Sequence, residues 1–263
     1  EEALAMILTV NIGNTHLTIA GYEHDTLQFS ARLHSNAAAT VDEYAMHLLN
    51  LLSLHRILPE QIDGGILGSV VPALTGRVLA ALRMLCSARI LTVGPGLKSG
   101  IKLRLDNPAQ LGAELLCGAV AALAEGPGPL AVISADTAIS IMAVNERQEL
   151  VGGVILPGPQ LSLAALVQNT AQLPQIDLSA PAAASILGKN TAACLQNGFV
   201  LGTAGLLDGL ADHFRAELGP DLRFYATGNL PRTIREACRT PIQYRENLIS
   251  EGLYRIWQRN RKG

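Results

Sequence analysis

The sequence has little charge and few aromatic residues. Charged residues make up 16% of its 263 residues and aromatic residues 4%, whereas hydrophobic residues reach 49%. A typical globular domain carries about 25% charged residues. Because disorder requires low hydrophobicity and high charge, this composition excludes an intrinsically disordered chain. Two classes remain compatible with it: a membrane protein, or a soluble protein that buries much of its surface in an oligomer.

Long hydrophobic runs are also missing. The longest apolar stretch, 115–124, is well short of the roughly 20 residues that a membrane-spanning helix needs, and it predicts a buried helix. Glu1 and Glu2 stand where a secretory signal would carry basic residues, so no such signal is expected. Met6 resembles a native start, so we expect residues 1–5 to be an addition that precedes the native sequence.

The chain has no excess of positive charge, and no two of its cysteines form a C-x-x-C motif. Its net charge is −2, which does not favour a nucleic-acid partner. The basic run 255–262 is expected to be a solvated helix end. The four cysteines are widely spaced, and this argues against a zinc site or a disulfide framework and favours a reducing cytoplasm. The six histidines show no metal-binding spacing, and neither a P-loop nor a dinucleotide fingerprint occurs.

What the sequence does contain is an alternation of strand and helix patterns, which favours α/β architecture. Residues 7–21 and 130–144 each predict two strands around a short polar corner. Aligning the corners pairs positions 123 residues apart, Asn11 with Ser134 and Asn14 with Thr137. This pattern predicts an internal duplication with halves 6–126 and 127–263. We expect the halves to pack together around a ligand cleft.

The first corner, Gly13-Asn14-Thr15, has the composition of a phosphate-binding turn. Glycine lets the backbone approach a ligand closely, and amide and hydroxyl groups donate hydrogen bonds. The same residues also suit an ordinary hairpin turn, and Gly152-Gly153 has the same ambiguity. Spacing alone leaves both interpretations open.

Seven motifs along the chain are similar to those of one family, the type III pantothenate kinases. They are NIGNT (11–15), SVVP (69–72), SGIKLRLDNPAQLGAE (99–114), GGVILPG (152–158), GKNTAACLQNG (188–198), TGN (227–229) and NLISEGL (247–253). The resemblance implies a duplicated RNase H-like fold of the acetate kinase, actin and hexokinase type (ASKHA), with ATP between the halves, in a homodimer. It also implies that ATP phosphorylates pantothenate, the first step of coenzyme A synthesis.

Several positions match the family's motifs. The resemblance assigns Gly13, Asn14 and Thr15 to the first phosphate corner, Thr137 and Ala138 to the second, Thr227 and Gly228 to the adenosine side, and Gly112 and Thr191 to the substrate site. Thr191 matches a threonine that reaches the neighbouring subunit's substrate site.

The acidic positions depart from the family pattern. Asn11 replaces an Asp that helps to hold Mg²⁺, and Ser134 replaces an Asp that binds a monovalent cation, K⁺ or NH₄⁺. Glu114 replaces the Asp that takes the proton from the substrate hydroxyl. Asp136 replaces a glycine in the second phosphate corner, where its charge opposes a phosphate.

Three further departures concern shape. Leu105 and Leu115 replace the Tyr and Arg of the substrate site, and Asn229 replaces the second glycine of the adenosine-side T-G-G loop.

Because phosphoryl transfer depends on positioning and charge around metal-bound phosphates, these departures predict a homologue with lost or strongly altered kinase activity, such as a regulatory or binding protein. The alternative is an active kinase, on pantothenate or another hydroxyl substrate, that uses Asp136 and Glu114 as replacement acids. Asp136 is either a cap of its own turn or a metal ligand. Glu114 is either a base or a solvated helix carboxylate.

Overall fold

The computed structural model describes residues 6–180 and 185–261. Residues 1–5, expected to precede the native start, lie outside this description. No helix in the described part is long and apolar enough to cross a membrane. The four cysteines are free thiols.

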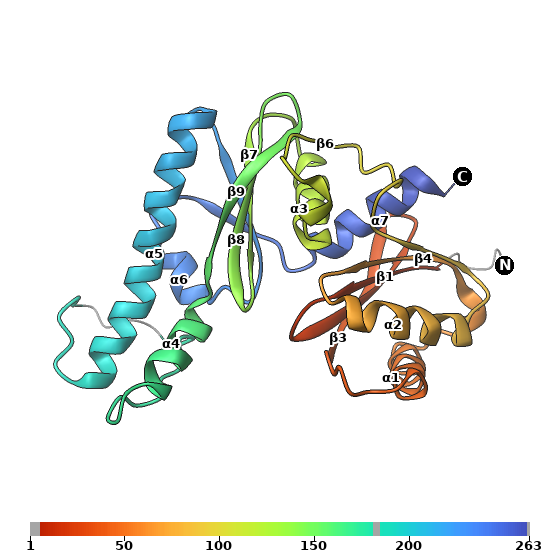
Figure 1. Cartoon of the computed structure of the whole chain (residues 1–263), viewed down its shortest axis with the longest axis horizontal. Coiled ribbons are helices and arrows are strands. Elements are labelled where there is room, and N and C mark those ends of the chain that lie inside the picture. The colour runs from red at the N-terminus through yellow and green to blue at the C-terminus, as the bar shows by residue number, and fades with distance from the viewer. Residues whose placement is uncertain (1–5, 181–184, 262–263) are drawn as a thin grey trace. The chain divides into compact units, whose positions relative to one another are not determined.

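The chain forms two compact units (Figure 1). The first contains the described residues up to Ile101, then Asp106–Ala121 and the segment from Asn247 onward. The second contains Lys102–Leu105 and Ala122–Glu246. The chain passes back and forth between these two units, whereas the predicted halves 6–126 and 127–263 meet at a single boundary. The two halves therefore remain a prediction about the duplicated sequence.

The first unit is built on a five-stranded sheet in the order β3-β2-β1-β4-β5. Its strands are β1 (Met6–Ile12), β2 (His16–Glu23), β3 (Thr26–His34), β4 (Ile62–Ser69) and β5 (Arg89–Thr92). β1 is antiparallel to β2 and parallel to β4. All seven residues of β1 are buried, as expected of a central strand with both faces covered.

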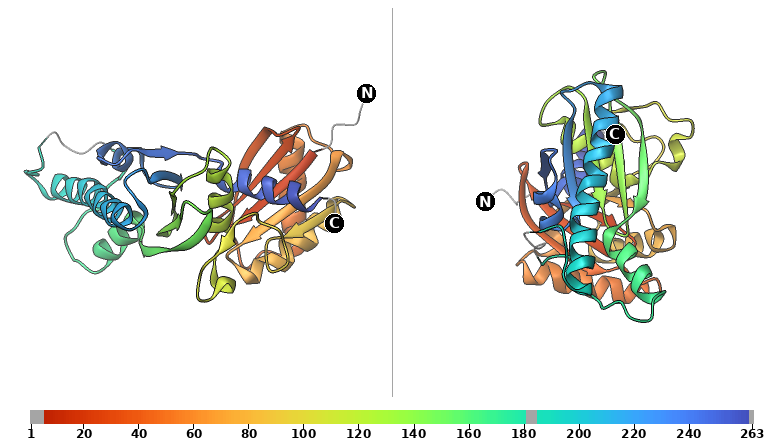
Figure 2. Two further views of the ribbon diagram at one scale, coloured as in Figure 1. Left: turned by 90° about the horizontal axis from the view of Figure 1, so that it is seen from above. Right: turned by 90° about the vertical axis from the view of Figure 1, so that its left-hand side faces the viewer.

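Helices cover both faces of the first sheet. They are α1 (Val41–Leu54) and α2 (Pro72–Leu85) on one face and α7 (Leu248–Asn260) on the other. The first unit also contains the start of α3 (Ala113–Leu123) and short 3₁₀ turns at Pro59–Gln61 and Pro108–Gln110. Leu8 and Val10 of β1 pack with α1 and α2, whereas Ile7 packs with Tyr254 of α7. Figure 2 shows α7 lying across these strands. Because side chains alternate along a strand, the odd-numbered positions of β1, including Asn11, face the α7 side.

The second unit repeats this arrangement in the order β11-β10-β7-β8-β9-β6. Its strands are β6 (Lys102–Leu103), β7 (Leu130–Ala135), β8 (Ala138–Val144), β9 (Glu149–Pro157), β10 (Arg223–Gly228) and β11 (Ile242–Tyr244), and its helices are α4 (Pro159–Gln168), α5 (Thr191–Leu218) and α6 (Arg232–Ala237). Val200, Ala204 and Leu207 of α5 pack against the sheet, along which the helix runs in Figure 2.

The two sheets share one topology. In each, an antiparallel meander of three strands is followed by two parallel strands beside its first strand. This confirms the internal duplication. β6 is an addition to the second sheet, because it pairs with β9 at the edge.

Candidate functional site: two corners with one acid each

The first corner joins β1 to β2 through Gly13, Asn14 and Thr15. The Gly13 N–H donates to the carbonyl of His16 at 2.9 Å, and the Ser35 hydroxyl donates to the carbonyl of Gly13 at 2.6 Å. A Cβ on Gly13 would lie 3.1 Å from the His16 oxygen and 3.2 Å from Oε1 of Glu114. Because Gly13 has no side chain, the His16 carbonyl and the Glu114 carboxylate can both lie close to its backbone. Asn14 is exposed and Thr15 is half-buried.

Asn11 and Glu114 form a pair at this corner. Asn11, on β1, is only 7% exposed, and Glu114 lies in the first turn of α3. Nδ2 of Asn11 donates to Oε1 of Glu114 at 2.9 Å, while Oδ1 of Asn11 is buried without a hydrogen-bond partner. The first corner therefore has one carboxylate, and a neutral amide donor holds it.

This pair does not fit a divalent cation held between two carboxylates. Mg²⁺ takes oxygen ligands, yet the Asn11 amide turns an N–H toward Glu114. A cation between the two side chains would have to displace that hydrogen bond. Across residues 6–180 and 185–261, no group of three or more His, Cys, Asp or Glu side chains could hold a metal ion.

Close packing sets the position of α3. Its start is a turn in which the Leu115 N–H donates to the Gly112 carbonyl at 3.1 Å. A Cβ on Gly252 of α7 would collide with the Cys117 backbone, so glycine allows α7 to pack directly on α3. The Cys117 thiol is fully buried; burial, and secondarily the charge of Glu114, raises its pKa. Cys117 therefore serves packing rather than nucleophilic chemistry.

The second corner joins β7 to β8, and β10 runs parallel beside it. The register pairs Thr227 with Ser134 and Gly228 with Ala135, which brings the predicted positions of both segments together. Thr227 is buried and donates through Oγ1 to the carbonyl of Glu246 at 3.3 Å. Thr137 and Ala138 complete the hairpin, as the Asp136 N–H donates to the carbonyl of Ala138 at 2.9 Å.

The backbone at Gly228 requires glycine. Its φ is +84°, and a Cβ there would collide with the carbonyl oxygen of Ala135. The Tyr244 hydroxyl donates to the Gly228 carbonyl at 2.7 Å, and the Arg235 guanidinium lies 3.8 Å from the centre of the Tyr244 ring. Tyr244 and Arg235 therefore fix the direction in which the Gly228 carbonyl points.

Asp136 pairs with Asn229. Nδ2 of Asn229, just after β10, donates to Oδ1 of Asp136 at 2.8 Å. The partner of this carboxylate thus lies outside its own turn, 93 residues along the chain. The second corner, like the first, has one carboxylate held by an asparagine amide.

Two further predicted substrate positions belong to the second unit. Leu105 follows β6 and is half-buried, whereas Thr191 is the exposed first residue of α5. In the described part of the chain, no hydrogen bond joins Thr191 to Asp136, Thr227 or Gly228.

Sequence reasoning missed the roles of Ser35 and Tyr244, which support the corner backbones. Ser35 follows a strand that the pattern did not predict, and Tyr244 ends a strand of only three residues. The departure at Asn229 was visible in the sequence, but its pairing with Asp136 was not.

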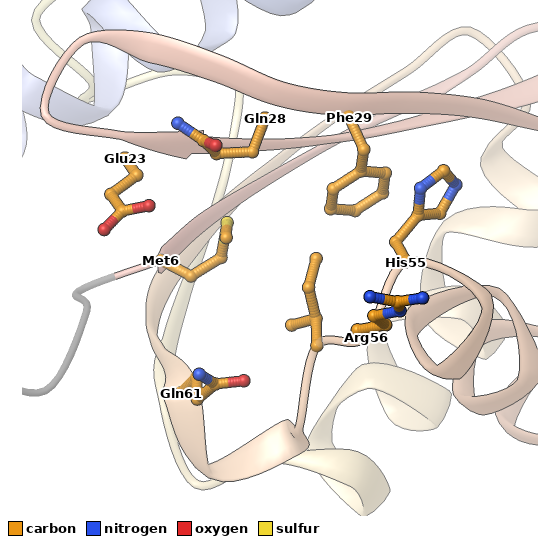
Figure 3. Close-up of a pocket in the computed structure, with 8 residues that line it drawn as sticks. Met6, Glu23, Gln28, Phe29, His55, Arg56 and Gln61 are labelled. Carbon is orange, nitrogen blue, oxygen red and sulfur yellow. The ribbon is translucent and has the colours of Figure 1, made fainter.

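One cavity of the first unit contains none of these residues. It has a volume of about 200 Å³. Its lining residues are Met6, Glu23, Gln28, Phe29, His55, Arg56, Ile57 and Gln61. The side chains of Met6 and Phe29 point into it (Figure 3). It is separate from the first corner, since no corner residue lines it.

Comparison with known proteins gives a consistent result. A family model for type III pantothenate kinase matches residues 7–213. The type III pantothenate kinase of Exiguobacterium sp. is 34% identical and aligns over 98% of this chain and 100% of its own length. That of Rhodospirillum centenum is 36% identical over 97% of this chain and 99% of its own.

Solved structures support the fold alone. A putative Baf family transcriptional activator from Campylobacter jejuni superposes with a TM-score of 0.53 at 17% identity, covering 97% of this chain and 98% of its own. A putative 2-dehydro-3-deoxygalactonokinase from Sinorhizobium meliloti gives 0.58 at 13% identity, covering 96% of each chain. With the repeated sheets, these likenesses confirm the duplicated actin/hexokinase-type fold. The near-complete matches at more than 30% identity show that this chain belongs to the type III pantothenate kinase family.

Proposed function

We propose that this protein is a type III pantothenate kinase homologue whose ATP-dependent phosphorylation of pantothenate is lost or strongly reduced. The observation that carries the proposal is the hydrogen bond from Nδ2 of Asn11 to Oε1 of Glu114, 2.9 Å long. In this pair an amide N–H occupies the position beside Glu114 where a carboxylate would help to bind a cation. Phosphoryl transfer relies on metal ions that neutralise the developing charge, so losing that carboxylate weakens catalysis directly.

The second corner supports the same proposal. Membership of a kinase family implies the use of ATP and a divalent metal, and the resemblance adds K⁺ or NH₄⁺. Ser134 offers the monovalent cation a hydroxyl in place of a carboxylate, and Asp136 adds a negative charge beside the expected phosphates. We infer that ATP, Mg²⁺ and the monovalent cation all bind weakly.

A working kinase is the second candidate, and the position of Glu114 favours it. Its Oε1 lies over Gly13, at the corner where a base for the substrate hydroxyl would be needed. In this alternative Glu114 takes the proton and Asp136 contributes to cation binding.

A turnover assay separates the two candidates. Purified protein is incubated with ATP, pantothenate, Mg²⁺ and K⁺ or NH₄⁺, and phosphorylated product is measured. The proposal predicts no turnover above background and no thermal shift at millimolar ATP. Sustained turnover would refute it in favour of the rewired kinase.

A restored variant provides the matched test. The triple substitution Asn11→Asp, Ser134→Asp and Asp136→Gly is expected to increase Mg²⁺-dependent ATP binding. Flat binding in this variant, combined with turnover by the native protein, would refute the hypothesis that the altered acids have made the site degenerate.

We also propose a cytoplasmic homodimer. The low overall charge supports it, as do exposed apolar side chains on the second unit, among them Ile155 at 75% and Leu161 at 46% exposure. Light scattering of the purified protein would reveal the oligomeric state, and a monomer at micromolar concentration would contradict this proposal.

A further inference from the structure

The second corner lies where the ends of three elements meet. The carboxyl ends of the parallel strands β7 and β10 are adjacent, and α4 begins beside them. The Gly158 N–H donates to the Thr137 carbonyl at 2.9 Å, and a Cβ on Gly158 would collide with the Asp136 and Thr137 carbonyls. Ligands of α/β proteins bind at the carboxyl ends of such strands.

The first turn of α4 leaves this place electropositive. Gly158 caps the helix without a side-chain hydrogen bond, and no acidic residue occurs in the first turn. The amide dipoles of a helix favour an anion at this end. The one carboxylate among the residues of the corner itself is that of Asp136.

Asp136 occupies the corner without backbone strain. Its φ is outside the left-handed region, as is that of Asn229, so neither position requires glycine for the backbone. Their side chains change the chemistry rather than the shape of the chain. The hydrogen bond from Nδ2 of Asn229 to Oδ1 of Asp136 then holds the carboxylate in one direction.

Asn229 is itself tied to neighbouring elements. Its N–H donates to the Ala135 carbonyl at 2.5 Å, and Nε2 of Gln160, in the first turn of α4, donates to its carbonyl at 3.5 Å. The backbone of Asn229, which carries the side-chain amide that contacts Asp136, is therefore hydrogen-bonded to both β7 and α4.

We propose that Asp136, positioned by Asn229, is the resident anion of this corner and determines the charge of the ligand it accepts. It excludes a phosphate chain and leaves binding of an uncharged nucleoside unaffected. This inference rests on the proposed loss of kinase activity and gives it a specific physical cause. A carboxylate held in place repels a phosphate more than one free to turn toward solvent, so Asn229 is a positioning residue.

The test compares ATP with adenosine as probes of the full-length protein. Dissociation constants of both are measured by calorimetry for the native protein, Asp136→Asn and Asn229→Ala, without divalent metal. Asp136→Asn removes the charge but keeps the size of the side chain. Asp221→Asn is the matched control, because Asp221 is exposed and precedes β10, at the end of that strand opposite Gly228.

The expected result is a change confined to the charged probe. Asp136→Asn should bind ATP at least about tenfold more tightly than the native protein, equivalent to about 1.4 kcal/mol. Adenosine affinity should stay within about twofold. Asn229→Ala should give a smaller gain for ATP, and Asp221→Asn should change neither probe.

Three results would overturn the inference. They are an unchanged ATP affinity in Asp136→Asn, an equal gain for adenosine, and an equal gain in Asp221→Asn. If Asp136→Asn does not bind ATP at all, the inference is overturned in the same way as by an unchanged ATP affinity. Unfolding midpoints of each variant show that it is folded. Turnover by the native protein would refute the proposed loss of activity, whereas the ATP-to-adenosine ratio judges the role of Asp136 on its own.

Discussion

The two corners use the same pair of groups in opposite surroundings. In the first, the amide of Asn11 belongs to a buried central strand and the carboxylate of Glu114 to a helix. In the second, the carboxylate of Asp136 belongs to the hairpin and the amide of exposed Asn229 follows a parallel strand.

Burial decides what each pair contributes. When a buried polar group loses a partner, water cannot take that partner's place, whereas in an exposed pair water compensates for most of the loss. The first pair should therefore govern stability, and the second should govern the charge presented to a ligand. Substitutions at the two corners test this division.

The largest effect is expected for Asn11→Asp. It places a second carboxylate against Glu114 in a buried position and should cost about 3 kcal/mol of unfolding free energy at pH 7. Like charges raise the pKa of such a pair, so the loss is present above that pKa and disappears as the pH falls and one group protonates. Urea unfolding at pH 7 and pH 4.5 measures it.

The exposed Asn14→Asp is the control for that substitution, since it adds the same charge two residues from the strand end without burial. Equal stability of Asn11→Asp and the native protein at pH 7, without divalent cations, would contradict the importance of the buried pair.

Glu149 lies outside both corners and has cationic partners, Arg104 and Lys102. The hydrogen bond from Asn145, followed by that from Arg104, lowers the pKa of Glu149 to about 2. Since this pKa is lowered, the stabilisation is complete above the unfolded value near 4.5 and is lost as the pH falls toward 2. Glu149→Gln should flatten the acid limb of a melting-temperature profile, and an unchanged limb would count against this assignment.

A smaller loss is expected for Tyr244→Phe, which removes the hydroxyl that donates to Gly228 and keeps the ring under Arg235. One hydrogen bond of this kind contributes about 1 kcal/mol. Chemical denaturation measures the loss, and Tyr244→Leu, which also removes the ring, should lose more. A neutral Tyr244→Phe would show that the Gly228 backbone is fixed without this bond.

The smallest effect on stability is expected at the second pair. Asp136→Ala and Asn229→Ala should each change the unfolding free energy by less than about 0.5 kcal/mol, with a coupling of similar size in the double variant. A coupling of several kcal/mol would abolish the distinction between the two corners.

The sequence predicted the corners because their strands are continuous apolar runs with polar turns between them. It missed β3, whose residues are all exposed or half-buried except Phe29, and β11, which has only three residues. Such edge strands form because a neighbouring strand offers hydrogen bonds, and no local pattern reports that.

The site was predictable residue by residue but not in its pairing. Asn11, Glu114, Asp136 and Asn229 each stand out as departures from the family's motifs. That each asparagine donates to an acid depends on where α3 meets β1 and on the register of β10 against β7, both set by tertiary packing. The prediction of Asp136 as a cap of its own turn could not include a partner 93 residues away.

The position of α7 has a consequence for synthesis of the chain. This helix packs on β1, β2 and β4, yet it is made after the entire second unit. During translation one face of the first sheet stays uncovered until residues 248–260 leave the ribosome, while the second unit already has all its strands. The N-terminal sheet should therefore be the last part to become resistant to proteolysis, although its strands are the first to be synthesised.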